Sequence, residues 1–175
     1  YVYCANNPII LIDPDGMDIL PATETEGKAY QEFRNLVFSD KKYAHVQKEI
    51  TRLEGADETF RIRMGENITS DAGGGNFVYN KETGEFDVNI GSSGDFSTNE
   101  KLSHELKHAF QYMEGKIGFD FKGSEPLGKS MAYDRLDELE AFDRQAEFGK
   151  SLSTNEIHDK YSKLPYPKDN ITIKN

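Results

Sequence analysis

Two segments in the first third of the chain carry apolar residues at steps of three and four, which is the spacing of a helix with one buried side. We therefore predict helices over residues 28–38 and 41–53. The apolar positions are Tyr30, Phe33, Leu36 and Val37 in the first segment, and Tyr43, Val46, Ile50 and Leu53 in the second. The small and polar residues 19–27 predict a linker before them.

The next segments alternate between apolar and polar residues, which predicts strands with one face buried. Residues 58–64 place Phe60, Ile62 and Met64 on one face. Residues 77–79 and 85–90 predict a hairpin around the turn at 80–84. Together these segments predict a small antiparallel sheet.

A third helix is predicted over residues 97–115. Ser97 followed by Glu100 is a capping box, which satisfies backbone N–H groups at a helix start, and Gly115 is a natural end. The apolar stripe along this helix consists of Leu102, Leu106, Ala109 and Met113. One side of the helix is therefore expected to pack on the sheet, leaving another side free for chemistry.

That other side carries His104, Glu105 and His108 in the pattern H-E-x-x-H. Histidines four residues apart lie on one face of a helix, so both imidazoles can reach one metal ion. Glu105 can then accept a proton from water at the metal. With this chain's own His and Glu frequencies, such a pattern occurs by chance with a probability of about one per cent. The motif predicts a zinc peptidase site with Glu105 as general base.

Catalytic zinc usually has three protein ligands, and no third histidine follows at metzincin spacing. We therefore expect a carboxylate from a further helix, predicted over residues 130–148. The candidates are Asp137, Glu138, Glu140 and Asp143. The step Glu140-Ala141 resembles the Glu-Ala step of gluzincins, which implies Glu140 as third ligand, with Glu138 and Asp137 next. An aspartate, Asp137 or Asp143, can instead orient a bound histidine.

The order of helices, small sheet and H-E-x-x-H helix resembles the N-terminal half of zincin peptidases. This resemblance implies an α+β, zincin-like fold in which a small antiparallel sheet packs on the motif helix, with further helices before and after it. It also implies substrate binding along an edge strand, which we assign to residues 85–90. An oxyanion donor is expected from Tyr133, Tyr161, Tyr166, Arg135 or Arg144.

Composition narrows the class of protein. The chain has 175 residues and a net charge of -10, which argues against non-specific binding of nucleic acid. Its one cysteine, Cys4, excludes an internal disulfide and a cysteine-rich zinc site. No apolar run approaches the roughly 20 residues of a membrane span, and the mean hydropathy is -0.72. We expect one polar domain with its own core.

The first eighteen residues contain three short motifs, Tyr1-x-Tyr3, Asn7-Pro8 and Asp13-Pro14-x-Gly16, and Met17 follows the last of them. This stretch resembles the end of the core domain of RHS-repeat proteins, which form a β-shell around a variable C-terminal toxin and usually have Leu where this chain has Met17. The resemblance implies self-cleavage close to Met17 with Asp13 as one of two aspartates. It divides the chain into residues 1–18, the end of the RHS core or a linker, and residues 19–175, the toxin domain.

The sequence thus predicts a zinc metalloendopeptidase that acts as a secreted RHS-type effector in a target cell. The His-Glu-Leu-x-His-Ala core looks similar to effector zinc peptidases. The expected partners are a protein substrate, a cognate immunity protein and the RHS shell of the same polypeptide. Two alternatives stay open, a metal-binding zincin module without catalysis and a nuclease toxin.

Overall fold

One mixed sheet of four strands organises the computed structural model, which describes residues 19–66, 68, 74–127 and 133–165. The strands are β1 (Ile19–Pro21), β2 (Phe60–Gly65), β3 (Gly75–Asn80) and β4 (Glu85–Gly91), in the spatial order β1-β2-β4-β3. β1 and β4 run parallel to β2, whereas β3 runs antiparallel to β4. The RHS-like stretch and Tyr166 lie outside the described residues.

The expectation of an antiparallel sheet is therefore wrong for all but the predicted hairpin. Between β1 and β2 the chain forms two helices that return it to the starting end of the sheet, and such a crossover makes the two strands parallel. The expected edge strand is also wrong, because β4 lies between β2 and β3, and the edge strands are β1 and β3. β1 replaces part of the expected linker, since three residues are too few to show alternation.

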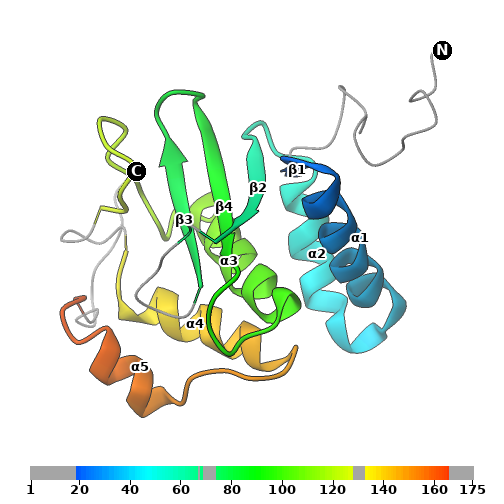
Figure 1. Cartoon of the computed structure of the whole chain (residues 1–175). Coiled ribbons are helices and arrows are strands. Elements are labelled where there is room, and N and C mark those ends of the chain that lie inside the picture. Colours follow the sequence, from blue (N-terminus) through cyan, green and yellow to red (C-terminus); the bar gives the residue numbers. More distant parts are fainter. Residues whose placement is uncertain (1–18, 67, 69–73, 128–132, 166–175) are drawn as a thin grey trace.

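Within the described residues the chain forms six helical segments, and most of their predicted positions are confirmed. They are α1 (Glu24–Ser39), the 3-10 turn η2 (Lys41–Tyr43), α2 (Ala44–Leu53), α3 (Thr98–Met113), α4 (Arg135–Ala146) and α5 (Thr154–Lys160). α1 and α2 lie at the β1 end of the sheet, while α4 and α5 lie on the far side of α3 from them (Figure 1). Within the described ranges, no helix combines the length and apolar character needed to cross a membrane.

The core forms where the apolar stripe of α3 meets the sheet. Leu102, Leu106 and Ala109 are buried, and α3 packs against β3, β4 and α4. Residues at alternate positions along the strands belong to the same hydrophobic core. Aromatic rings from β3, β4, the end of α3 and the segment after it pack against one another there. These residues are Phe60, Ile62, Phe77, Phe86, Val88, Ile90, Tyr112 and Phe119. This packing fixes which face of α3 points away from the sheet.

The first turn of α3 is held at several points. The predicted capping box is confirmed, because the Ser97 hydroxyl accepts a hydrogen bond from Glu100 N and the Glu100 carboxylate accepts one from Ser97 N. The same carboxylate accepts a hydrogen bond from Lys150 N, after the end of α4. The Lys101 ammonium donates to Gly91 O at 2.8 Å and to Ser93 O at 2.7 Å. α3 is thereby tied both to the sheet and to the segment after α4.

Candidate metal centre

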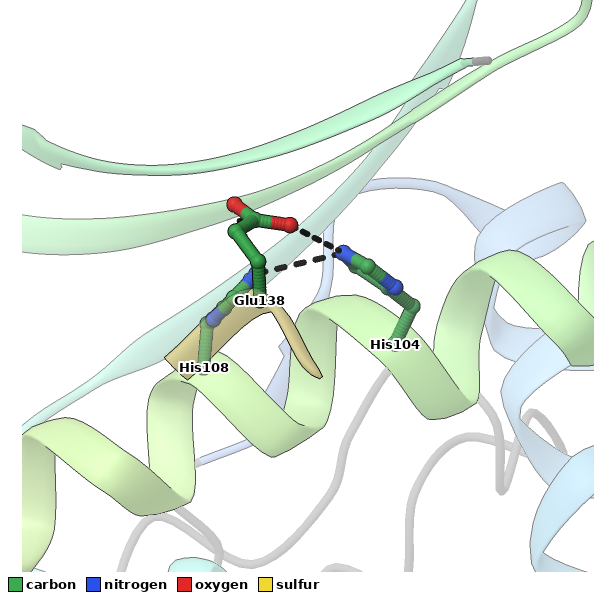
Figure 2. A group of neighbouring side chains, drawn as sticks. All are labelled: His104, His108 and Glu138. Atoms are coloured by element: carbon green, nitrogen blue, oxygen red, sulfur yellow. Dashed lines mark hydrogen bonds and ion pairs between the residues drawn. The ribbon is translucent and has the colours of Figure 1, made fainter. Parts of the chain in front are cut away.

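Two histidines on α3 face each other across one helical turn. His104 Nε2 and His108 Nε2 are 3.2 Å apart, and each residue is 6% exposed. Both imidazoles point toward the Glu138 side chain of α4 (Figure 2). The helical spacing of the motif therefore brings the two predicted ligands together.

The third group is supplied by Glu138 on α4. Its Oε2 lies 3.6 Å from His104 Nε2, and its Oε1 lies 3.6 Å from His108 Nε2. Figure 2 shows this carboxylate above the two rings, projecting from the short stretch of α4 that crosses α3. Ligand atoms from the three residues lie within 4.8 Å of one another, and all three side chains are buried. The structure thus brings together a group able to hold a metal ion.

The sequence analysis assigned the third position to Glu140, whereas the structure places Glu138 next to the two histidines. The Glu140 carboxylate accepts hydrogen bonds from Lys116 Nζ at 3.0 and 3.1 Å and from Gln111 Nε2 at 3.2 Å. Residues two apart on a helix project about 200° apart, so one helix cannot aim both glutamates at the histidines. Asp137 accepts a hydrogen bond from Asp134 N as part of the α4 cap, and Asp143 is exposed.

The three groups lie close to the separation expected around a tetrahedral ion. Zinc lies about 2.0–2.1 Å from histidine nitrogen and about 2.0–2.2 Å from carboxylate oxygen, so two ligand atoms are about 3.3–3.5 Å apart. The two imidazole nitrogens are 3.2 Å apart, each lies 3.6 Å from a different oxygen of Glu138, and one ligand atom from each residue lies within 4.8 Å of the other two. The donor set of two imidazoles and one carboxylate is also the set found in His₂Glu zinc sites.

Unsatisfied polar atoms point to the same conclusion. Within the described part of the chain, His104 Nδ1, Glu105 Oε2 and Glu138 Oε2 are buried without a hydrogen-bond partner. Burying a carboxylate oxygen without a partner costs several kcal/mol in general, and a bound cation offsets that cost. The residues present therefore fit a divalent metal ion, while its identity stays open.

The ionisation of the three groups is coupled. Burial disfavours the charged form of Glu138, but the adjacent imidazoles outweigh burial and lower the pKa of this carboxyl group. Burial also disfavours protonated His104, although Glu138 and Glu105 outweigh it and raise the pKa of His104. Burial lowers the pKa of His108 to about 4. At neutral pH His108 is therefore uncharged, which is the form that binds metals.

Glu105 lies beside this group and is 5% exposed. Burial raises the pKa of Glu105 to about 8, with a further increase from the charge of Glu138 and an opposing effect from His104. A cation held by the neighbouring ligands would favour the ionised form. Glu105 is therefore placed to titrate near neutral pH, which suits a general base.

A cavity of about 420 Å³ contains the site. Its walls include the three ligands and Glu105, the β3 residues 75–78 and the aromatic rings of Tyr133 and Tyr161. The Tyr133 hydroxyl donates a hydrogen bond to Glu138 Oε1. The outer strand of the sheet therefore forms one wall of the cavity that holds the candidate ligands.

Gly75 allows β3 to approach Glu105. A Cβ atom at Gly75 would collide with Glu105 Oε1 and would lie 2.9 Å from Asn89 O. The neighbouring Gly74 has a φ of 117°, a conformation that favours glycine, and a Cβ there would lie 2.9 Å from Lys101 Nζ. Gly74 and Gly75 are therefore required by close packing against Lys101 and Glu105, which the composition of the chain alone did not reveal.

Among the expected oxyanion donors, Tyr133 and Tyr161 line the cavity. Arg144 is paired with Glu49 at 2.7 Å, and Arg135 donates to Tyr161 O, Ser162 O and Leu164 O. Sequence reasoning missed Gln111, which is fully buried behind His108. A polar residue three positions after a motif histidine was the available signal.

Comparison of the chain with known protein families, curated proteins and solved structures finds no match. The candidate site therefore stands on its own geometry.

Proposed function

We propose that this chain is a zinc-dependent metalloendopeptidase with His104, His108 and Glu138 as metal ligands and Glu105 as general base. The observation that carries the proposal is the buried group of two histidines and one glutamate, next to the Glu105 carboxyl group, whose Oε2 has no hydrogen-bond partner. The H-E-x-x-H pattern supports the roles proposed for His104, Glu105 and His108, because it is typical of zinc hydrolases. The zincin-like character of the fold belongs to the same proposal.

The bound metal would supply Lewis acidity, polarising the scissile carbonyl and making water more acidic. Glu105 would accept the proton of the attacking water and deliver it to the leaving amine. Tyr133, which donates to Glu138 and lies in the cavity wall, is our candidate for the hydroxyl that stabilises the developing oxyanion. Burial of the site excludes bulk water from these steps.

We further propose that a substrate segment adds as a strand along β3. β3 is one of the two edge strands, and it lines the cavity beside Glu105. An extended peptide at a sheet edge is held by main-chain hydrogen bonds, while pockets for alternate side chains give specificity. This assignment replaces residues 85–90, which form an inner strand.

The biological setting that we propose rests on the sequence resemblance described above. The domain, residues 19–175, would be the toxin of an RHS-type secreted protein, enclosed by the RHS shell and delivered into a target cell. Its partners would be a protein substrate there and a cognate immunity protein that blocks the cavity. The formal net charge of -10 favours a basic partner surface.

The test compares wild type with Glu105→Gln and Glu138→Gln. Metal content is measured after purification, and newly formed protein N-termini are profiled in cells that express each form. We expect one zinc per wild-type chain, retained in Glu105→Gln and lost in Glu138→Gln, with new N-termini in wild type alone. Zinc without new N-termini would leave a metal-binding module, and degraded nucleic acid in their place would indicate a nuclease.

A further inference from the structure

Gln111 lies on α3 next to His108, on the side of the imidazole ring away from the candidate metal site. Its side chain is fully buried, and its Oε1 lies 2.8 Å from His108 Nδ1. Its amide nitrogen donates to Asp137 O at 3.0 Å and to Glu140 Oε2 at 3.2 Å. One amide therefore contacts a metal-ligand candidate on α3 and two groups on α4.

These contacts determine which way the amide faces. A backbone carbonyl and an ionised carboxylate can only accept hydrogen bonds, so the amide nitrogen must point toward Asp137 O and Glu140. The amide oxygen then faces His108 Nδ1 and can only accept. His108 must therefore carry its proton on Nδ1, which leaves the lone pair of Nε2 directed at the ligand group.

The contact between the two histidines agrees with this tautomer. His104 Nε2 and His108 Nε2 are 3.2 Å apart, and a hydrogen bond between them needs one donor and one acceptor. With the proton of His108 on Nδ1, its Nε2 is the acceptor and His104 Nε2 is the donor. The four contacts of His108 and Gln111 are thus satisfied by one arrangement of protons.

The same amide also ties the two ligand-bearing helices together. Asp137 O belongs to the residue directly before Glu138, so the hydrogen bond from Gln111 fixes the α4 backbone next to the third ligand. The second acceptor, Glu140, is itself held by Lys116 at 3.0 and 3.1 Å. The chain of contacts His108–Gln111–Glu140–Lys116 thus links the site to the surface.

We propose that Gln111 is a positioning residue that selects the metal-binding tautomer of His108 and sets the distance between His108 and Glu138. It touches neither substrate nor metal and acts through His108 and the α4 backbone. This inference rests on the metal site of the proposed function but not on proteolysis. Glu140, predicted from the sequence as a ligand, supports the site from behind by accepting from Gln111.

The main test is zinc affinity of Gln111→Met, which preserves side-chain length and removes all three hydrogen bonds. Competition against a chromophoric zinc chelator measures the dissociation constant. Loss of a residue that orients a metal-bound histidine typically weakens metal binding about 10–100-fold, and we expect a change in that range. The cobalt(II) absorption spectrum of the variant should also change, because the ligand geometry relaxes.

Gln47→Met is the matched control. The Gln47 amide donates to Val37 O at 2.8 Å and to Asp40 O at 3.3 Å, so it also bridges two backbone carbonyls, but at the α1–α2 corner. We expect its zinc affinity to equal that of wild type. Equal affinity of Gln111→Met and wild type would overturn the inference and leave the metal site intact. Absence of zinc binding in wild type would overturn both.

A second measurement does not depend on folding of a variant. The histidine tautomers of the metal-free wild-type protein are read from two-bond ¹⁵N–¹H correlations in the imidazole rings. We expect His108 to show the Nδ1–H form near neutral pH. A dominant Nε2–H form would overturn the inference even if Gln111→Met failed to fold.

Discussion

We predict that the Glu105 carboxyl group lowers the folding stability of the metal-free protein near neutral pH, and that Glu105→Gln removes this effect. The carboxyl group is buried, and burial raises its pKa to about 8. In the unfolded chain the pKa returns to the ordinary value of 4.5. Gln has nearly the same shape and no charge, so the substitution removes the titration while conserving the volume of the side chain.

The sign of the effect follows from proton binding. Between pH 4.5 and about 8 the folded state keeps the Glu105 proton, whereas the unfolded state releases it. Stability contributed by this group is therefore complete below pH 4.5 and is lost as the pH rises toward 8. At about 1.36 kcal/mol per pKa unit, the loss between about pH 5 and about pH 7.5 amounts to about 3 kcal/mol.

The assay is thermal unfolding of wild type and Glu105→Gln in the presence of a chelator, at several pH values. We expect the stability of the variant relative to wild type to increase as the pH rises, by about 3 kcal/mol, or about 6–12 °C in Tm for a domain of this size. Taking the difference removes the histidine titrations that both proteins share. A gain that does not change with pH would refute the assignment of Glu105 as a buried, protonated acid.

Zinc should remove most of the pH dependence of the stability difference between wild type and Glu105→Gln. A cation beside Glu105 favours its ionised form, so the destabilisation of wild type should shrink when the site is filled. The same difference measured with saturating zinc should therefore vary little with pH. If it stayed as large as in the chelated proteins, the metal would not lie next to Glu105.

Three further predictions concern the site and its supports. Glu138→Gln should abolish stoichiometric zinc binding in dialysed protein, whereas Glu140→Gln should retain it, and the opposite result would restore the sequence assignment. Gly75→Ala should abolish the proposed proteolysis and cost about 1–3 kcal/mol of stability, because the added Cβ collides with the Glu105 carboxylate, while Gly123→Ala, where the Cβ would make only ordinary van der Waals contacts, should do neither. Lys101→Met should lower the free energy of unfolding in urea by about 3 kcal/mol through loss of two charge-assisted bonds to backbone carbonyls, and an unchanged value would refute that role.

The sequence predicts most of the helices and the start of α3 because those features depend on local patterns. Ser97 and Glu100 are three residues apart, and their reciprocal hydrogen bonds involve nothing outside that turn. The alternation of Phe60 with Ile62, and of Phe86 with Val88, likewise reports one buried face of each strand. Local chemistry of this kind can be read without knowing what lies across the fold.

Strand order could not be predicted in this way. β2 and β4 are neighbours in parallel register, with Phe60 opposite Phe86, although β3 separates them in the sequence. Alternation says which residues point inward, but it says nothing about which strand lies next to which. The pairing is decided by the crossover of α1 and α2 and by the hairpin that places β3 outside, and both depend on the whole chain.

The choice between Glu138 and Glu140 shows the same limit within a single helix. Both are charged, both follow an acidic residue or lie near one, and motif spacing tolerates either. What decides is the rotation of α4 about its axis, which places Phe142 against His104 with ring centroids 4.4 Å apart and the carbonyl of Asp137 at Gln111. Residue 138 lies four positions before Phe142 and so shares its face, whereas residue 140 points toward Lys116. A helix that buries Phe142 on α3 must therefore present Glu138 to the histidines.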